Sequence, residues 1–470
     1  MVYLRARIPH ILIGLLVLLV LSPSPVRRNL VTYIEKARTA AASGDPEAAL
    51  DYIDRALLID PGLKSLELIA AEAALATDHP ERAIPYLNSL SERDQDQEII
   101  LCLTAEMRAA MGQYLEAFML WEQAENLCSE RRDFLYNLAD HLVDNEKFSM
   151  AERVVEHLSS LAHSDPELHF QLAALTALRD PEQALIQLRL LDELSADNQA
   201  LTAELIKAIE DSRHLNLMQF TLSKVGQVFA KNFEWSFAAQ AFRNALDIQP
   251  DYSDALSFLG LAIDELGQDG LSWLKQAERA DPIQALPHIN LAVHWLRNNA
   301  PQLALFELEQ AAVLDPSNPI IPAQIAQTYE YLGDINIAIE LYRAATELAP
   351  KDPNLWLLLA QSSSQNNFDV LNIGLPAARN AAALAPDSAA ALDTLGYSYY
   401  LLGDLEFAGR FLFRALAIDS GFASTHYHLG LYYAAQLDMQ SSIVSFEMAV
   451  ILDPESVVGQ LARRTLETLQ

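Results

Sequence analysis

The chain has 470 residues, of which 51% are hydrophobic and 20% charged, so it holds enough apolar material to build a large core. Its 63 acidic and 32 basic side chains give a formal net charge of −31, which repels phosphate backbones and excludes general nucleic-acid binding. Two cysteines are too few for a disulfide framework or a four-ligand zinc site.

The N-terminal segment, residues 1–28, has the parts of a signal peptide or a short membrane anchor. Arg5 and Arg7 precede an apolar run over residues 8–21, and a polar stretch with prolines follows. As a helix this run would be about 21 Å long, short of the ~30 Å hydrocarbon core, which favours a signal peptide. The small-x-small site at 22–24 is followed by a proline, which disfavours cleavage. Both alternatives stay open, and each predicts export or membrane attachment.

A short helix-terminating dipeptide, usually ending in proline, recurs along the second half of the chain. It falls at Gln249-Pro250, Asp281-Pro282, Asp315-Pro316, Ala349-Pro350, Ala385-Pro386, Asp419-Ser420 and Asp453-Pro454. Successive steps are 32 to 36 residues long, with 34 the commonest. A fixed period of this length is typical of helical-repeat proteins.

The spacing inside one unit predicts two helices. In residues 320–350, apolar residues fall on one helical face and then, after Gly333, on a second face that ends at Pro350. The residues on these faces are Ile325, Ala326 and Tyr329, followed by Ala338, Tyr342 and Ala345. A single hairpin cannot bury its own apolar face, so we expect the hairpins to stack.

This pattern resembles the tetratricopeptide repeat, whose signature is W-x2-L-G-x2-Y, then A-x3-F, then P. One unit matches it at Val225, Gly226, Phe229, Ala238, Phe242, Ala245 and Pro250, and another at Leu429, Gly430, Tyr433, Phe446, Ala449 and Pro454. The resemblance covers nearly all of the chain after the N-terminal segment. It implies an all-α fold, a right-handed α-solenoid of about eleven or twelve helix-turn-helix repeats.

How closely each unit matches the repeat signature varies along the chain, and this variation suggests four parts after the N-terminal segment. These are a degenerate array at 29–195, an atypical junction helix at 196–218, a regular array at 219–456 and a capping helix at 457–470. In the capping helix we expect Leu461, Leu466 and Leu469 to face inward, because the end of a solenoid needs a polar outer surface.

The resemblance also implies a concave groove, lined by the first helix of each unit, that holds extended peptides or partner helices. The candidates are polar side chains, most of them amides or hydroxyls, that are not assigned to the predicted core. Such groups can form hydrogen bonds with an extended backbone. They are Asn290, Gln324, Gln327, Asn354, Gln361, Asp393, Ser398 and Tyr427. A carboxylate-binding clamp is not expected, since only Lys224 and Lys231, in one unit, offer lysines on that face.

Acidic residues are concentrated in one segment. Residues 91–210 hold 24 acidic and 9 basic side chains, so their net charge is −15. Such a segment could steer basic partners, although a solvated, solubilising surface is the favoured explanation.

The two cysteines have two possible roles. Cys102 begins a first helix and Cys128 ends the second helix of the same predicted hairpin, so both lie at one end of it. In an exported chain they can form a disulfide, whereas a wide helix separation would leave two buried thiols.

The common catalytic and cofactor motifs are absent from the sequence. It has no glycine-rich phosphate loop, no GxSxG elbow and no HExxH pair, and His426 and His428 are spaced too closely on a helix to share a metal. We therefore expect no cofactor, no metal and no enzymatic activity. The predicted function is an exported or membrane-anchored protein-binding scaffold. The alternative is an accessory or regulatory subunit of an envelope secretion or polysaccharide-handling enzyme system.

Overall fold

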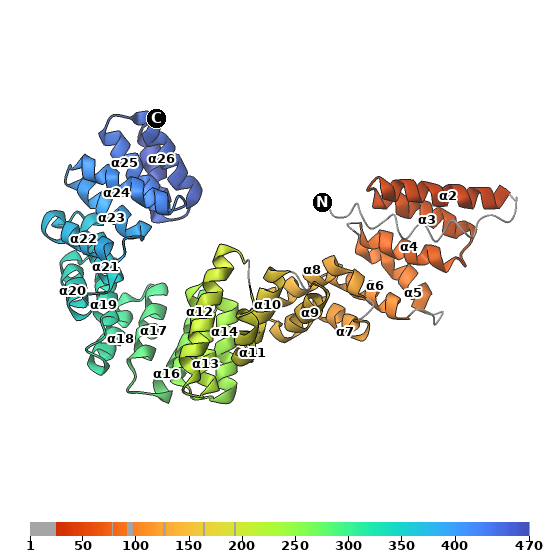
Figure 1. Ribbon diagram of the computed structural model, residues 1–470, viewed down its shortest axis with the longest axis horizontal. Coiled ribbons are helices and arrows are strands. Elements are labelled where there is room, and N and C mark those ends of the chain that lie inside the picture. The colour runs from red at the N-terminus through yellow and green to blue at the C-terminus, as the bar shows by residue number, and fades with distance from the viewer. Residues whose placement is uncertain are drawn as a thin grey trace. The chain divides into compact units, whose positions relative to one another are not determined.

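The computed structural model describes residues 25–469 apart from 78, 92–96, 126–127, 163–164 and 192–193. Within these ranges the secondary structure is helical and contains no strand, which confirms the predicted all-α fold (Figure 1). The chain divides into two compact units, Met1–Asn244 and Ala245–Gln470. The apolar run predicted as a signal or anchor lies outside the described residues. No described helix combines the length and the apolar character that crossing a bilayer requires.

The first unit contains helices of very different lengths, from the short η4 to the 18-residue α2 and α12. Its helices are α2 (Pro25–Ala42), α3 (Pro46–Ile59), α4 (Lys64–Leu75), η3 (Pro80–Ala83), α5 (Ile84–Ser91), α6 (Gln97–Ala110), α7 (Tyr114–Gln123), η4 (Cys128–Glu130), α8 (Arg132–Asp144), α9 (Phe148–Leu161), α10 (Pro166–Ala177), α11 (Pro181–Leu188), α12 (Ala196–Arg213), α13 (Met218–Lys231) and α14 (Trp235–Ile248), and the boundary between the units falls within α14.

The second unit continues the succession of helices from α15 to α27. Its helices are α15 (Ser253–Glu265), α16 (Leu271–Ala280), α17 (Ala285–Arg297), α18 (Pro301–Leu314), α19 (Ile320–Leu332), α20 (Ile335–Leu348), α21 (Pro353–Gln365), η5 (Val370–Gly374), α22 (Leu375–Leu384), α23 (Ala389–Leu401), α24 (Leu405–Ile418), α25 (Ala423–Ala435), α26 (Met439–Leu452) and α27 (Val457–Leu469).

Consecutive helices pair into hairpins, and each hairpin packs on the next. In the first unit α8 pairs with α9, and α9 then packs on α10; in the second unit α23 pairs with α24, and α24 packs on α25. The short connections make paired helices antiparallel. The predicted arrangement of stacked helix-turn-helix repeats is therefore confirmed within each unit.

Glycines in the first helix of several hairpins let a large side chain of the second helix approach. A Cβ atom on Gly226 would lie 2.6 Å from the ring of Phe242, and one on Gly430 would lie 2.6 Å from the ring of Phe446. Phe242 and Phe446 are fully buried. The signature glycines are thus required by close packing of the two helices.

The turn between paired helices places one residue in the left-handed region. Gly333 ends α19 with φ 88°, as the sequence predicted, because glycine adopts this conformation without steric cost. Phe233 and Leu437 occupy corresponding turns with φ 64° and 66°. Their side chains are largely exposed, with 79% and 82% of their surface accessible.

The capping helix is present, but its inward face differs from the prediction. Gly459 and Ala462 of α27 are buried, and Leu466 packs against the cluster of Phe446 and Ala449. Leu461 and Leu469 are instead partly exposed. The buried positions follow the i, i+3, i+7 spacing of a helical face, and Leu461 and Leu469 fall beside it.

The structure pairs the two cysteines. Cys102 in α6 and Cys128 in η4 form a disulfide with a Cα–Cα separation of 5.6 Å, and both side chains are buried. The bond closes the end of the hairpin formed by α6 and α7. Of the two alternatives left open by the sequence, the structure has the disulfide.

The stretch predicted as an atypical junction forms the long helix α12, which packs against α11 and α13. The boundary between the compact units lies further on, between Asn244 and Ala245.

Candidate functional site

Three of the predicted groove residues are buried and bonded within the protein. Asn290 donates to Ser257 Oγ at 3.0 Å, and Ser398 lies 2.9 Å from the hydroxyl of Ser364. Asp393 accepts from Ser424 Oγ at 2.8 Å and from Nδ1 of His428. These residues were expected to be left free by the core. They instead join one first helix to the next, so their polar groups are already satisfied.

The other five predicted groove residues keep some exposure. Gln327 and Asn354 are exposed, and Gln324 and Gln361 are half-buried. Tyr427 is also half-buried, and its ring lies 5.6 Å from that of Phe446. The described residues of the second unit therefore do not gather all eight side chains on one accessible surface.

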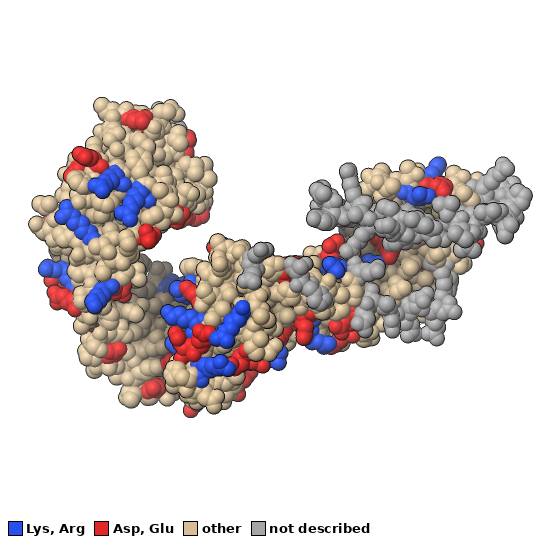
Figure 2. Space-filling view, viewed as in Figure 1, with Lys and Arg blue, Asp and Glu red and all other residues tan. Residues whose placement is uncertain are grey.

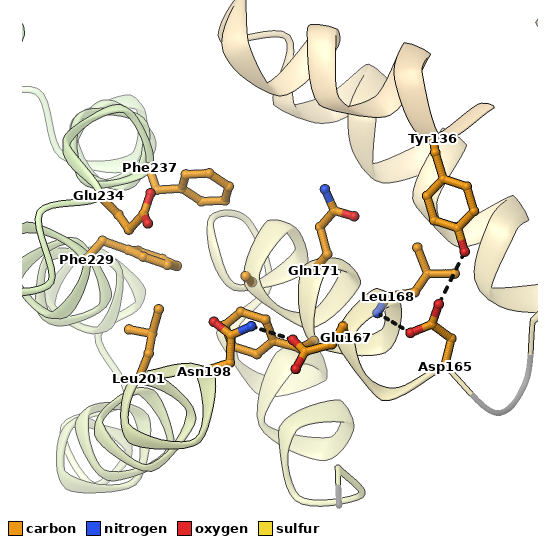
Figure 3. Close-up of a pocket in the computed structure, with 12 residues that line it drawn as sticks. Tyr136, Asp165, Glu167, Leu168, Gln171, Asn198, Leu201, Phe229, Glu234 and Phe237 are labelled. Carbon is orange, nitrogen blue, oxygen red and sulfur yellow. Dashed lines mark hydrogen bonds between the residues drawn. The ribbon is translucent and has the colours of Figure 1, made fainter. Parts of the chain in front are cut away.

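The first unit contains a pocket that the sequence did not single out. Its volume is about 380 Å³, and residues from α8, α10, α12, α13 and the start of α14 surround it (Figure 3). It is lined by Tyr136, Asp165, Glu167, Leu168, Phe170, Gln171, Ala174, Asn198, Leu201, Phe229, Glu234 and Phe237. A ligand bound here would contact side chains from α8, α10, α12, α13 and the start of α14.

The floor of the pocket is apolar. Phe229 is 1% exposed and its ring lies 5.2 Å from that of Phe237, which in turn stands edge-on to Phe148 at 5.0 Å. Leu201 and Phe170 are also buried. These side chains are fixed by the packing of α12, α13 and α14, so the floor is already formed without a ligand.

The rim of the pocket is acidic. Asp165 caps the N-terminus of α10, where its Oδ1 accepts from the Leu168 amide at 3.2 Å and its Oδ2 accepts from the Tyr136 hydroxyl at 3.3 Å. Burial, and after it the nearby Asp165, raise the pKa of Tyr136, so this hydroxyl stays protonated as a donor.

Glu167 is held in its ionised form. Its Oε1 accepts from the Ser195 amide at 2.7 Å, and its Oε2 accepts from the side-chain amide of Asn198 (Figure 3). These two hydrogen bonds lower the pKa of Glu167. Glu234 is exposed, and its carboxylate makes no hydrogen bond or ion pair with any residue that the structure describes.

Several basic side chains of the first unit are engaged in ion pairs. Six of them pair with carboxylates 25 to 35 residues earlier in the chain, in Arg82–Glu47, Arg131–Glu106, Arg153–Glu122, Arg179–Glu152, Arg213–Glu182 and Lys231–Glu204. Figure 2 accordingly shows acidic and basic side chains interleaved over α12 to α14. Among the described residues that line the pocket, none is basic.

The pocket was missed because it forms where the repeat signature fails. Asp165, Glu167 and Gln171 belong to a degenerate unit, and Asn198 and Leu201 belong to the stretch that fits no unit. The feature of the sequence that could have pointed to the pocket was the loss of the repeat signature within the acid-rich segment 91–210.

One group of side chains has ligand atoms close enough for a metal ion. The ligand atoms of Asp264, Asp269 and His294 all lie within 4.8 Å of one another. Asp264 Oδ1 already accepts from the Gly270 amide at 2.8 Å, and Oδ2 lies 2.8 Å from Nδ1 of His294. These contacts fix the turn between α15 and α16, and they account for the burial of both side chains.

The described fold and pocket define an array of helical hairpins that can present side chains from several hairpins to one ligand. Residues 323–362, which span most of α19, all of α20 and the first part of α21, match the family model of the tetratricopeptide repeat. No curated protein matches the chain at a significant level.

Several solved structures are similar to the chain. The Cut9–Hcn1 hetero-tetramer of the APC/C matches with 15% identity over 97% of this chain and 98% of that one, at a TM-score of 0.42. Yeast Tom70 matches with 14% identity over 94% and 96%, also at 0.42. YrrB, described as a tetratricopeptide-repeat protein with an unusual peptide-binding site, matches with 20% identity over 41% and 97%, at 0.32.

Proposed function

We propose that this protein is a non-enzymatic scaffold that binds partner proteins through the first-unit pocket. The pocket is the observation that supports this proposal. Its apolar floor is preformed, and its polar groups come from α8, α10, α12 and the start of α14. A partner would present an extended peptide or a helix, since either can follow a row of stacked hairpins. The acid-rich segment 91–210 favours basic partners.

A second contact surface is proposed for the second unit. The exposed Gln327 and Asn354 and the half-buried Gln324, Gln361 and Tyr427 remain candidates for hydrogen bonds to an extended partner. Asn290, Asp393 and Ser398 have structural partners and are left out of this surface.

We further propose that the protein is exported or membrane-attached through residues 1–28. The basic and apolar pattern of that segment supports this location. The Cys102–Cys128 disulfide also supports it, because such bonds persist mainly in oxidising compartments. An accessory or regulatory subunit of an envelope secretion or polysaccharide-handling enzyme system would use the same surfaces, and the captured partners would distinguish this alternative.

The proposed binding of partners through the pocket is tested with a substitution that fills the pocket. Gln171 extends from α10 between Phe237 and Tyr136 (Figure 3), so Gln171→Trp would occupy the space without removing a core side chain. The matched control is Gln310→Trp on the exposed face of α18. We expect cross-linking pull-downs from the native cell to lose partners with Gln171→Trp only. An unchanged set of partners in both variants would overturn the proposed use of the pocket.

The location is tested by fractionating cells that express the full chain or a chain lacking residues 2–24. Retention of the full chain in the membrane pellet indicates an anchor, and recovery of a shortened protein outside the cytoplasm indicates a cleaved signal. Recovery of the intact full chain in the cytoplasm would contradict both.

A further inference from the structure

We infer that the first-unit pocket selects a lysine or arginine side chain of its protein partner, with the aliphatic stem on the aromatic floor and the charged end at the rim of Glu167 and Glu234. This inference rests on the proposed function. It adds the residue type that the pocket recognises.

The rim offers negative charge that the protein itself does not neutralise. Glu234 has no partner among the described residues, and Glu167 is fixed by the Ser195 amide and the Asn198 side chain. With a further hydrogen bond from the Ser195 hydroxyl, these contacts engage about three of the roughly four acceptor sites of the carboxylate. Glu167 can therefore accept a further hydrogen bond from a cation without losing the contacts that position it.

Neighbouring cations do not cancel this charge. Lys231 is the basic residue nearest to Glu234 in the sequence, and its ammonium group pairs with Glu204 Oε1 at 2.5 Å. Asn232 also donates to Glu204, at 3.2 Å, which holds this pair in place. Arg132 lies close enough to the rim to act on the pKa of Tyr136, and it donates to the Leu161 carbonyl oxygen at 3.1 Å. A cation of the partner would therefore meet Glu167 and Glu234 rather than the Tyr136 side of the rim.

The floor suits the stem of a basic side chain. Lysine and arginine carry three or four methylene groups that pack on apolar surfaces while the charged end stays in water. The half-buried ring of Phe237, backed by the buried Phe229, supplies such a surface, and aromatic rings also attract cations. A glutamate would be repelled by the rim, and a glutamine would gain part of the packing without the charge interaction.

The surrounding segment adds a longer-range contribution. Residues 91–210 have 24 acidic and 9 basic side chains, so a basic segment is attracted before it docks. This attraction is screened by salt, whereas the contact inside the pocket is screened less. Binding should consequently weaken with salt but keep its preference for the basic side chain.

The test uses the purified full chain and three fluorescein-labelled decapeptides with the same apolar residues. The peptides carry three lysines, three glutamines or three glutamates, and binding is measured by fluorescence anisotropy. We expect the lysine peptide to bind at least tenfold more tightly than the glutamine peptide, and the glutamate peptide not to bind. Replacing lysine with arginine should preserve binding.

Two charge variants separate the pocket from the general acidity of the chain. Glu234→Gln should weaken binding of the lysine peptide about threefold to fivefold, as expected for one partly exposed ion pair. Glu309→Gln removes the same charge from the exposed face of α18, outside the pocket, and should leave binding unchanged. Equal effects of the two variants would overturn the inference, because the attraction would then be unspecific.

The inference and the proposed function fail in different ways. If Gln171→Trp abolishes partner capture while the lysine and glutamine peptides bind equally, the pocket is a partner site but does not select a cation. If the lysine peptide binds selectively but Gln171→Trp changes neither peptide binding nor partner capture, the cation site lies elsewhere and both proposals fail.

Discussion

His428 Nδ1 lies 2.9 Å and 3.0 Å from the two carboxylate oxygens of Asp393, which belongs to the first helix of the preceding hairpin. Asp393 is 2% exposed and also accepts from Ser424 Oγ. A buried carboxylate with these donors is satisfied only when α23 and α25 are in register. The pair therefore fixes how two consecutive hairpins stack.

The first prediction concerns this pair. Asp393→Ala leaves His428 and Ser424 without their acceptor, so we expect it to destabilise the second unit by about 1–3 kcal/mol. Thermal unfolding followed by circular dichroism measures the loss. Asp387→Ala is the control, because Asp387 is exposed and its side chain makes no hydrogen bond or ion pair with any described residue. Equal melting curves for the two variants would contradict the structural role of Asp393.

The second prediction tests the close approach of paired helices. Gly430→Val places a side chain where a Cβ atom alone would lie 2.6 Å from the Phe446 ring, so it should destabilise the protein by about 1–3 kcal/mol. Adding Phe446→Leu should recover part of the loss, since the smaller side chain relieves the contact. Gly62→Ala is the matched control, because its Cβ would meet Asp60 Oδ1 at 3.4 Å, an ordinary contact.

The third prediction concerns the disulfide. Reduction, or the double change of Cys102 and Cys128 to Ala, should cost about 3 kcal/mol, as expected for a loop closed over a separation of 26 residues. Unfolding of the wild type should therefore occur at a lower temperature when dithiothreitol is present. The double alanine variant should not respond to the reductant, and a response would show that the reductant acts elsewhere.

The fourth prediction concerns pH. The hydrogen bond from His288 to Glu307, at 2.7 Å, raises the pKa of His288 above its ordinary value of ~6.5, despite the opposing effect of burial. A raised pKa in the folded state means that the folded protein holds this proton more tightly than the unfolded chain. The stabilisation is complete below the unfolded pKa and is lost as pH rises through the folded pKa.

Glu307→Gln should thus lower the melting temperature more at pH 6 than at pH 9. The comparison of wild type and variant at each pH removes the contribution of other titrating groups. A difference in melting temperature that does not change between these pH values would show that the charged pair does not form.

The sequence predicted the hairpins well because their packing depends on small residues at fixed spacing. Gly333 ends a helix as its position predicted, and Gly226 and Gly430, which match the repeat signature, lie where paired helices approach closely. The buried alanines Ala326 and Ala338 likewise follow from the helical period.

The sequence could not predict the candidate site in the same way. Asn290, Asp393 and Ser398 lie on first helices as expected, but their neighbours across the interface decide whether they face a groove or bond to each other. The pocket depends on α8, α10, α12, α13 and the start of α14 meeting around one space. No local pattern encodes that meeting, since the lining side chains come from five helices that are separated in the sequence.

The glycine contacts have a further consequence for how such a chain arises. Gly226 meets Phe242, Gly396 meets Leu412, and Gly430 meets Phe446, so each partner lies sixteen residues after its glycine. Both members of every pair are therefore inherited together when one 34-residue segment of the gene is duplicated. A new copy arrives with its internal packing complete, and only its outer faces need to adapt to the neighbours. Copies can then diverge in sequence, as the degenerate units around the pocket have done, while the hairpin itself persists.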